Sequence, residues 1–119
     1  MREIKKTDEH LVLLIKELRK KSSQDKVGLW SAIAKNLSLP SRIRPEVNLF
    51  KINKYVKDGD IVVVPGKVLA TGSIDHKITV AAYNFSKAAR EKIMQKGVCM
   101  TIDELMKENI KGKNIRILK

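Results

Sequence analysis

The sequence contains very little cysteine. Cys99 stands alone among 119 residues, which excludes an intrachain disulfide. With only two histidines, His10 and His76, the chain also offers too few soft ligands for a structural zinc site. We therefore expect no metal and no cofactor, and we expect Cys99 to be a small, buried apolar residue.

Aromatic residues and long apolar runs are also scarce. Phe, Trp and Tyr make up 4% of the chain, which argues against binding single-stranded nucleic acid on a series of aromatic rings. No run approaches the roughly 18 apolar residues that a membrane-spanning helix needs. The first residues, MREIKKTDEH, contain no apolar signal-peptide core. We expect a cytoplasmic protein with no membrane partner.

Acidic residues are few relative to basic ones. The chain has 25 Lys and Arg against 13 Asp and Glu, a net charge of +12, and such an excess favours a polyanionic partner. Residues 19–57 hold most of it, with only Asp25 and Glu46 against ten basic residues: Arg19, Lys20, Lys21, Lys26, Lys35, Arg42, Arg44, Lys51, Lys54 and Lys57. Nucleic acid fits this pattern best, although a solubilising surface or a membrane-facing patch would also produce it.

The N-terminal segment, residues 1–39, predicts two amphipathic helices. The first is indicated by the helical spacing of Leu11, Leu14, Ile15 and Leu18. Thr7 is expected to cap it, with the cations of residues 19–21 at its carboxyl end and an interruption from Ser22 onward. The second helix ends before Pro40 and has the same spacing at Trp30, Ile33, Ala34 and Leu37. Trp30 is therefore expected in the core.

Residues 40–46 predict a basic connector bounded by prolines. Pro40 and Pro45 disfavour helix at themselves and at the residue before each of them, so we expect an extended segment. Because the prolines restrict the backbone, the guanidinium groups of Arg42 and Arg44 should be held in place for phosphate oxygens. Lys51 and Lys54 can add charge along the same ridge, and a solvated charged loop is the alternative.

Residues 47–119 predict a mixed α/β core. Short β-prone runs occur at 47–50, 61–64, 78–83 and 115–118, with turn signals at 58–60, 72–73 and 111–113. Ser86 is expected to cap a helix that ends with Gly97 in the C′ position. That helix should turn Ala88, Ala89 and Ile93 inward and Lys87, Arg90, Lys92 and Lys96 outward. Thr101 to Glu104 forms a capping box for another helix.

One domain over residues 1–119 is expected.

Enzymatic motifs are incomplete. Gly66 and Lys67 lack the first glycine and the following Ser or Thr of a phosphate-binding loop. Ser73, Asp75 and His76 supply the residue types of a hydrolytic triad, but neighbours in one turn point apart. We therefore expect no enzyme and no small-molecule substrate.

A helix-turn-helix DNA-binding protein is the alternative interpretation. Two helices separated by a short polar segment, with Lys26 and Lys35 on the second element, are typical of that motif. Against it, the densest arginines follow the second helix, and that helix offers few amide side chains for recognising base edges.

The sequence also resembles a known family in four stretches. These are RPEVNLFKI at 44–52, DGDIVVVPGKVLATG at 58–72, KITVAAYNFSKAAREKI at 77–93 and TIDEL at 101–105. In content, order and spacing they resemble the eighteenth large-subunit ribosomal protein of archaea and eukaryotes, which is related in fold to the fifteenth large-subunit protein of bacteria. The resemblance implies an α/β fold, an irregular β-β-α superhelix of short strands and helices preceded by an N-terminal two-helix segment.

The resemblance also implies a structural protein of the large ribosomal subunit, a monomer when free, that binds large-subunit ribosomal RNA and neighbouring ribosomal proteins. It points to Arg42, Arg44, Asn48, Lys51 and Lys67 as contact or motif-supporting residues. Ser41, where the family pattern has a basic residue, and the compact turn at Gly97 depart from that pattern. With the charge distribution, the predicted RNA-binding residues are Arg19, Lys20, Lys21, Lys35, Arg42, Arg44, Asn48, Lys51, Lys54 and Lys67.

Overall fold

A computed structural model describes residues 6–25, 28–40, 43–107 and 115–119. The chain divides into two compact units, Met1–Ile43 and Arg44–Lys119, and the division falls inside the predicted connector. In the part of the chain that is described, no helix has both the length and the apolar character needed to cross a bilayer.

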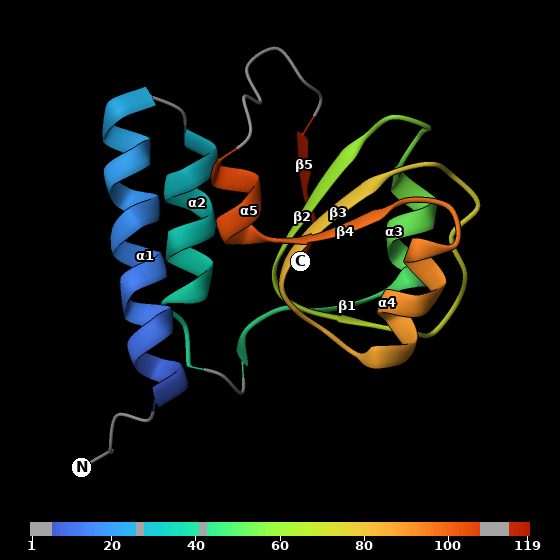
Figure 1. The fold of residues 1–119 in the computed structure, drawn as a ribbon, viewed down its shortest axis with the longest axis horizontal. Helices are drawn as coiled ribbons and strands as arrows, with labels where there is room; N and C mark the ends of the chain where they lie inside the picture. Colours follow the sequence, from blue (N-terminus) through green and yellow to red (C-terminus); the bar gives the residue numbers. More distant parts are fainter. Residues whose placement is uncertain (1–5, 26–27, 41–42, 108–114) are drawn as a thin grey trace. The chain divides into compact units, whose positions relative to one another are not determined.

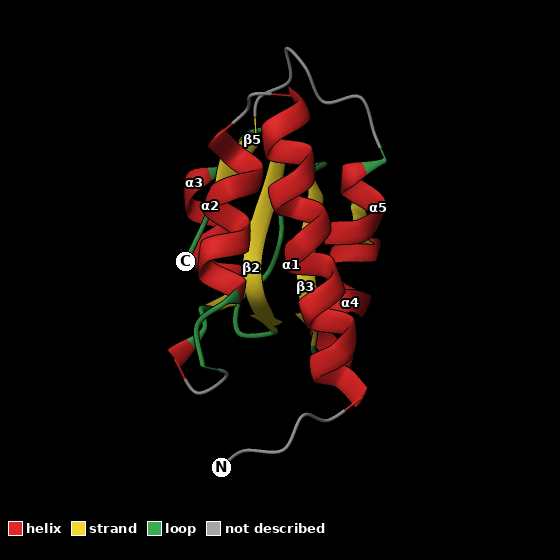
Figure 2. Ribbon diagram, turned by 90° about the vertical axis from the view of Figure 1, so that its left-hand side faces the viewer, coloured by secondary structure: helices red, strands yellow, loops and turns green. Residues whose placement is uncertain are grey.

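The first unit is a pair of helices, α1 (Lys6–Asp25) and α2 (Gly28–Leu37), which lie side by side and run in opposite directions (Figure 2). The predicted apolar faces are confirmed. Leu11, Leu14 and Leu18 of α1 are buried, as are Trp30, Ile33, Ala34 and Leu37 of α2. The ammonium of Lys21 lies 5.5 Å from the centroid of the Trp30 ring, so a cation of α1 contacts the largest side chain of α2.

The predicted ends of the first helix were wrong. Thr7 lies within α1 and is therefore not its N-cap. The helix continues through Ser22 and Ser23 to Asp25, so the cations of residues 19–21 are not in its last turn. Helix propensity differs among ordinary residues by less than about 0.7 kcal/mol, so Ser and Asp need not end a helix that packs along one face.

The second unit contains a parallel five-stranded sheet: β1 (Glu46–Asn48), β2 (Ile61–Leu69), β3 (Thr79–Phe85), β4 (Val98–Thr101) and β5 (Ile115–Ile117). The order is β1-β2-β3-β4. The remaining strand, β5, pairs with residues 61–63 of β2, whereas β1 pairs with residues 67–69. Because β3 occupies the opposite edge of β2, β1 and β5 follow one another along the same edge. The predicted α/β class with an N-terminal two-helix segment is confirmed.

Helices cover both faces of the sheet. Helices α3 (Leu49–Tyr55) and α4 (Lys87–Met94) lie on one face and α5 (Ile102–Met106) lies on the other (Figure 1). The core under α3 and α4 is formed by apolar side chains of the helices and the facing strand positions, among them Leu49, Ile52, Ala89, Ile93, Val62, Val64, Val80 and Ala82. Alternation along the strands turns Val63 and Ala81 to the opposite face, where they are also buried.

Two elements were missed and one strand was too long in the prediction. The β-prone run 47–50 is a strand only to Asn48, and α3 begins at Leu49. The helix had a signal, since Leu49, Ile52 and Val56 are spaced i, i+3, i+7 and are buried. The edge strand β4 was not predicted. The four residues of β4 show no clear alternation of buried and exposed side chains, which is the pattern that would have indicated a strand.

Strand β2 extends beyond its predicted end because Gly66 accommodates a close approach. The register of β2 against β3 shifts between Val64 and Lys67, at the Pro65-Gly66 pair. A Cβ at residue 66 would lie 2.0 Å from the carbonyl oxygen of Pro45, so only glycine fits there. The same oxygen accepts a hydrogen bond from the Lys67 amide at 3.0 Å.

The helix caps were largely predicted. The Ser86 hydroxyl accepts from the Ala89 amide, and Thr101 and Glu104 form the reciprocal capping box. Ala88, however, is exposed. Gly97 is not the C′ residue, since the cap of α4 is Gln95. Glycine is needed at 97 for another reason, because a Cβ there would lie 2.1 Å from the Ile78 carbonyl oxygen.

Two further expectations need correction. The Ile43 amide donates to the Pro40 carbonyl at 3.0 Å, an i to i+3 bond typical of a turn, so the connector is not extended at its start. Cys99 is half-buried rather than buried. The turn predicted at 111–113 lies outside the described residues.

Candidate nucleic-acid interface

Arg44 and Lys67, two predicted RNA-binding residues, meet at one corner of the sheet. Strands β1 and β2 pair Glu46 with Lys67, and the Pro45 carbonyl accepts from the Lys67 amide. The Arg44 guanidinium lies over the Tyr83 ring of β3, with Cζ 5.7 Å from the ring centroid. A cation on an aromatic face loses freedom of movement. This corner therefore holds the Arg44 guanidinium over Tyr83 and brings the backbone of Lys67 next to that of Pro45.

Asn48 supports the chain at the carboxyl end of β2. Its side-chain oxygen accepts a hydrogen bond from the Thr71 amide at 3.2 Å, and the Thr71 carbonyl accepts from the Phe50 amide at 2.9 Å. Asn48 is also the N-cap of α3, but its side chain makes no capping bond there. The side chain therefore joins the end of β1 to the turn after β2.

The two predicted lysines of α3 differ in their surroundings. Lys51 is half-buried, and its ammonium donates to the Lys119 carbonyl at 2.6 Å. Lys54 is exposed, with its ammonium 5.6 Å from the centroid of the Tyr55 ring. Both charges reach the surface from a helix that is anchored by Leu49 and Ile52.

The remaining predicted residues belong to the first unit. Arg19 and Lys20 of α1 and Lys35 of α2 are exposed, and Lys21 is half-buried beside Trp30. Arg42 lies outside the described residues.

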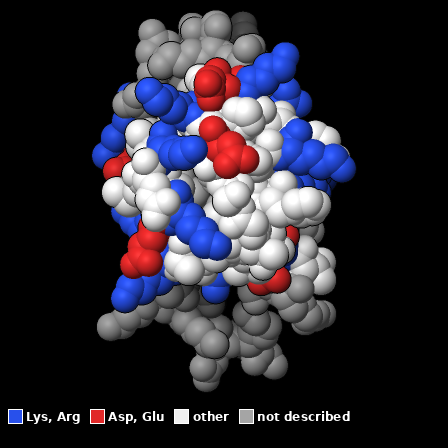
Figure 3. Space-filling view, turned by 90° about the vertical axis from the view of Figure 1, so that its right-hand side faces the viewer, with Lys and Arg blue, Asp and Glu red and all other residues white. Residues whose placement is uncertain are grey.

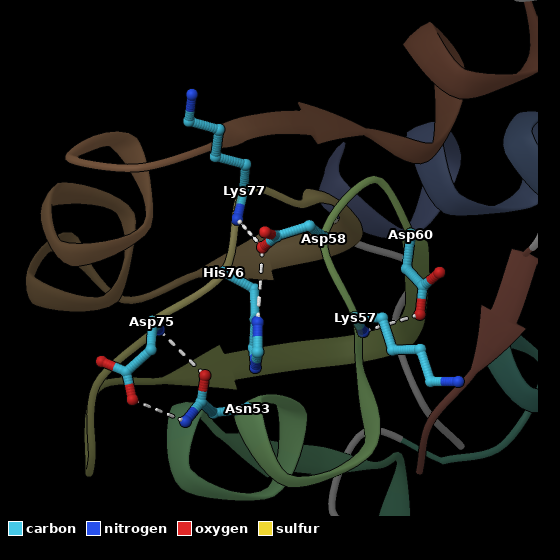
Figure 4. Close-up of polar contacts among 7 residues, drawn as sticks. All are labelled: Asn53, Lys57, Asp58, Asp60, Asp75, His76 and Lys77. Carbon is cyan, nitrogen blue, oxygen red and sulfur yellow. Dashed lines mark hydrogen bonds and ion pairs between the residues drawn. The ribbon is translucent and has the colours of Figure 1, made fainter.

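Acidic side chains of the second unit are bonded within the protein (Figure 4). Asp60 is buried and accepts from the Lys57 amide at 2.9 Å. Asp58 accepts from the Lys77 amide at 3.0 Å and lies 3.3 Å from Nδ1 of His76. Asp75 accepts from the Asn53 carboxamide at 3.1 Å, while the Asp75 amide donates back to Asn53 at 2.9 Å. These carboxylates organise loops through backbone amides and neutral side chains.

The same bonds settle the predicted role of Ser73, Asp75 and His76. Asp75 is bonded to Asn53 and His76 to Asp58, so the two side chains have different partners. All three residues lie in the irregular segment between β2 and β3. Asp75 and His76 thus bond to different residues, as we expected of neighbours in such a segment.

Cys99 has the chemistry of a protected thiol. Burial raises the pKa of Cys99 above its ordinary value, and the nearby Arg90 guanidinium acts more weakly in the opposite direction. Its Sγ lies 3.8 Å from the Arg90 carbonyl oxygen. A raised pKa disfavours the nucleophilic thiolate.

Lys92 is a residue that sequence reasoning did not select as a site. Its ammonium donates to the carbonyl oxygens of Ala70 at 2.9 Å and Gly72 at 3.0 Å, so it clamps the turn after β2 to α4. The face that carries α3 and α4 has Lys and Arg around its margin, a few Asp and Glu among them, and uncharged atoms across much of its centre (Figure 3). The exposed basic residues of the second unit are Lys54, Lys57, Lys77, Lys87, Arg90, Lys92, Lys96, Lys107, Arg116 and Lys119.

The fold and this surface define a small basic α/β protein with a parallel sheet and many exposed cations. The family model described as "Ribosomal protein 60S L18 and 50S L18e" matches residues 1–119. Among curated proteins, the chain is 44% identical over 119 residues to the large ribosomal subunit protein eL18 of Methanothermobacter thermautotrophicus, covering 99% of this chain and 98% of the relative. It is 45% identical over 116 residues to the protein of that name from Archaeoglobus fulgidus, covering 97% and 99%.

A third relative, the large ribosomal subunit protein eL18 of Methanoregula boonei, is 44% identical over 119 residues, covering 99% of this chain and 98% of the relative. The chain belongs to the L18/L18e family of large-subunit ribosomal proteins. The family resemblance carried by the four sequence stretches is thereby confirmed, and with it a structural role in the ribosome.

Proposed function

We propose that the chain binds folded large-subunit ribosomal RNA through its exposed lysines and arginines, in the large ribosomal subunit of the cytoplasm. The observation that carries the proposal is the corner where Arg44, stacked on Tyr83, stands beside Lys67. Planar guanidinium groups match phosphate oxygens with two parallel hydrogen bonds, and fixing one beforehand lowers the entropy cost of contact.

The charge balance supports a polyanionic partner. Basic residues outnumber acidic ones 25 to 13 over the chain. In the second unit, Asp58 and Asp60 accept hydrogen bonds from backbone amides and Asp75 accepts one from the Asn53 carboxamide, so these carboxylates are occupied in shaping loops. Exposed lysines such as Lys54, Lys57 and Lys77 supply the positive charge for such a partner. Each phosphate neutralised releases condensed counterions, which makes binding favourable and dependent on salt.

RNA shape is the expected basis of specificity. An A-form duplex hides its base edges in a deep, narrow groove and presents phosphates and 2′-hydroxyls instead. Arg19, Lys20, Lys21 and Lys35 in the first unit, and Arg42, Arg44, Asn48, Lys51, Lys54 and Lys67 from the connector onward, are the proposed contact or supporting residues. The whole of residues 1–119 acts as one ribosomal-protein domain in this proposal. It is a monomer before assembly, contacts neighbouring ribosomal proteins and takes no small-molecule substrate.

The family favours this function over the helix-turn-helix alternative. In addition, the Asn36 carboxamide of α2 donates to the Ala32 carbonyl of its own helix at 2.9 Å, which occupies an amide that could recognise a base.

The test is binding of the purified protein to deproteinised large-subunit ribosomal RNA over a series of salt concentrations. We expect tight binding whose logarithm falls linearly with the logarithm of salt concentration, and weaker binding to small-subunit ribosomal RNA and to duplex DNA. Equal affinity for all three polyanions would contradict shape-specific recognition, and no binding at moderate salt would contradict the proposal as a whole.

A further inference from the structure

Phe50 is the most exposed large apolar side chain among the described residues, with 65% of its surface accessible. It lies in the first turn of α3, next to the buried Leu49. Exposed aromatic rings of this kind gain free energy when another flat or apolar group covers them.

The base of the Phe50 side chain is fixed by the turn after β2. The Phe50 amide donates to the Thr71 carbonyl at 2.9 Å. Gly72 has a φ of +102°, and a Cβ at that position would lie 2.6–2.8 Å from the backbone nitrogen, Cβ and Cα of Phe50. The turn therefore packs directly against the residue, and the ring projects from a supported position.

A cation is hydrogen-bonded to the same turn. Lys92 donates to the carbonyl oxygens of Ala70 and Gly72, the latter being the residue that packs against Phe50. An ammonium group has three N–H donors, and these bonds use two of them. One donor and the positive charge remain for an anion beside this turn.

We propose that Phe50 stacks on one unpaired base of large-subunit ribosomal RNA while Lys92 contacts a phosphate beside that base. This rests on the proposed function. Sequence-specific RNA recognition uses unpaired bases that stack on aromatic side chains, and a neighbouring cation complements the phosphate that accompanies every base. An apolar side chain of a protein would leave the Lys92 charge without a partner. One ring serves one base, consistent with the low aromatic content of the chain.

The experiment compares three Phe50 variants for affinity to deproteinised large-subunit ribosomal RNA. Phe50→Ala should weaken binding roughly five- to 150-fold. Phe50→Leu, which keeps apolar volume but has no π face, should lose most of that factor, and Phe50→Tyr should retain affinity. The slope of affinity against salt should stay constant in all three, whereas Lys92→Gln should reduce it by about one contact.

Leu13→Ala is the matched control, because Leu13 is 58% exposed on α1 and is not one of the proposed contact residues. Its affinity should not change. Thermal unfolding of each variant verifies the fold, which removal of an exposed side chain should leave intact.

Wild-type affinity in Phe50→Leu would overturn the stacking proposal, and so would an equal loss in Leu13→Ala. If Phe50→Leu bound the RNA normally but failed to co-sediment with large subunits, the ring would instead contact a protein. None of these outcomes contradicts the proposed function as long as the wild-type protein binds the RNA. If the wild-type protein did not bind the RNA, both the stacking proposal and the proposed function would be contradicted.

Discussion

The guanidinium of Arg44 lies over the ring of Tyr83, 39 residues away in the sequence, with 5.7 Å between Cζ and the ring centroid. Arg44 directly precedes the Pro45 residue whose carbonyl fits against Gly66, so the backbone of β1 and β2 fixes the position from which the side chain extends. The contact connects the connector to the third strand of the order β1-β2-β3-β4.

Tyr83→Leu should weaken RNA binding without removing a charge. A cation–π contact near the surface contributes about 0.5–1 kcal/mol, so we expect about a two- to fivefold loss of affinity. The salt slope should not change, because Arg44 keeps its charge. Tyr83→Phe, which keeps the ring, is the control in the same filter-binding assay. Equal affinities of the Leu and Phe variants would show that the ring does not position the guanidinium.

Gly66→Ala should destabilise the second unit. The added Cβ would lie 2.0 Å from the Pro45 carbonyl oxygen, a backbone atom that cannot move without disturbing the pairing of β1 with β2. We expect the free energy of unfolding to fall by about 1–3 kcal/mol, measured by urea denaturation. Gly28→Ala is the matched control, since no atom lies within 4 Å of its added Cβ. Unchanged stability of the Gly66 variant would contradict the close approach.

The reciprocal bonds between Asn53 and Asp75 should be energetically coupled. Two hydrogen bonds join α3 to the segment between β2 and β3. In a double-mutant cycle of Asn53→Ala and Asp75→Ala, we expect a coupling free energy of about 0.5–1.5 kcal/mol in thermal or urea unfolding. The cycle measures the bond between the two side chains, because the backbone amide of Asp75 is still present in Asp75→Ala. Additive single effects would mean that this side-chain bond does not stabilise the segment. Phe50→Ala is the control: its effect on the free energy of unfolding should add to that of either variant, because no described hydrogen bond joins Phe50 to Asn53 or Asp75.

Cys99 should react slowly with alkylating reagents in the native protein. Burial raises the pKa of its thiol, so the thiolate fraction at mildly alkaline pH is smaller than in an unfolded chain. The folded state therefore binds this proton more tightly, and the thiol's contribution to stability is present below the ordinary thiol pKa and lost as pH rises through the raised value. Iodoacetamide labelling against pH, with the urea-unfolded protein as reference and Cys99→Ala as background, measures the shift. Identical pH profiles of native and unfolded protein would refute it.

The long, periodic and capped segments were predictable from sequence. Helices α1 and α2 have repeated apolar spacing, and Ser86 and Thr101 cap α4 and α5 through local hydrogen bonds. What could not be predicted depends on distant partners. Strand β1 is only three residues long and is stabilised by pairing with residues 67–69, and the edge strand β4 is defined by its pairing with β3.

At the candidate surface too, the charged residues could be predicted from the sequence, whereas their contacts with distant residues could not. Charge density and the family resemblance selected Arg44 and Lys67, but nothing local in the sequence indicates that the ring under Arg44 belongs to Tyr83. Lys92 was expected only to face outward. Its structural role depends on hydrogen bonds to the carbonyl oxygens of Ala70 and Gly72, which lie 22 and 20 positions earlier in the sequence.

The most direct measurement is the salt dependence of ribosomal RNA binding by Arg44→Ala combined with Lys67→Ala. If these cations contact phosphates, affinity should fall at every salt concentration and the log–log slope should decrease by about two, one for each contact. Urea unfolding of the double variant verifies the fold, because both side chains are half-buried and Arg44 stacks on Tyr83. The same affinity and slope as the wild-type protein, with the fold intact, would contradict RNA binding through this corner.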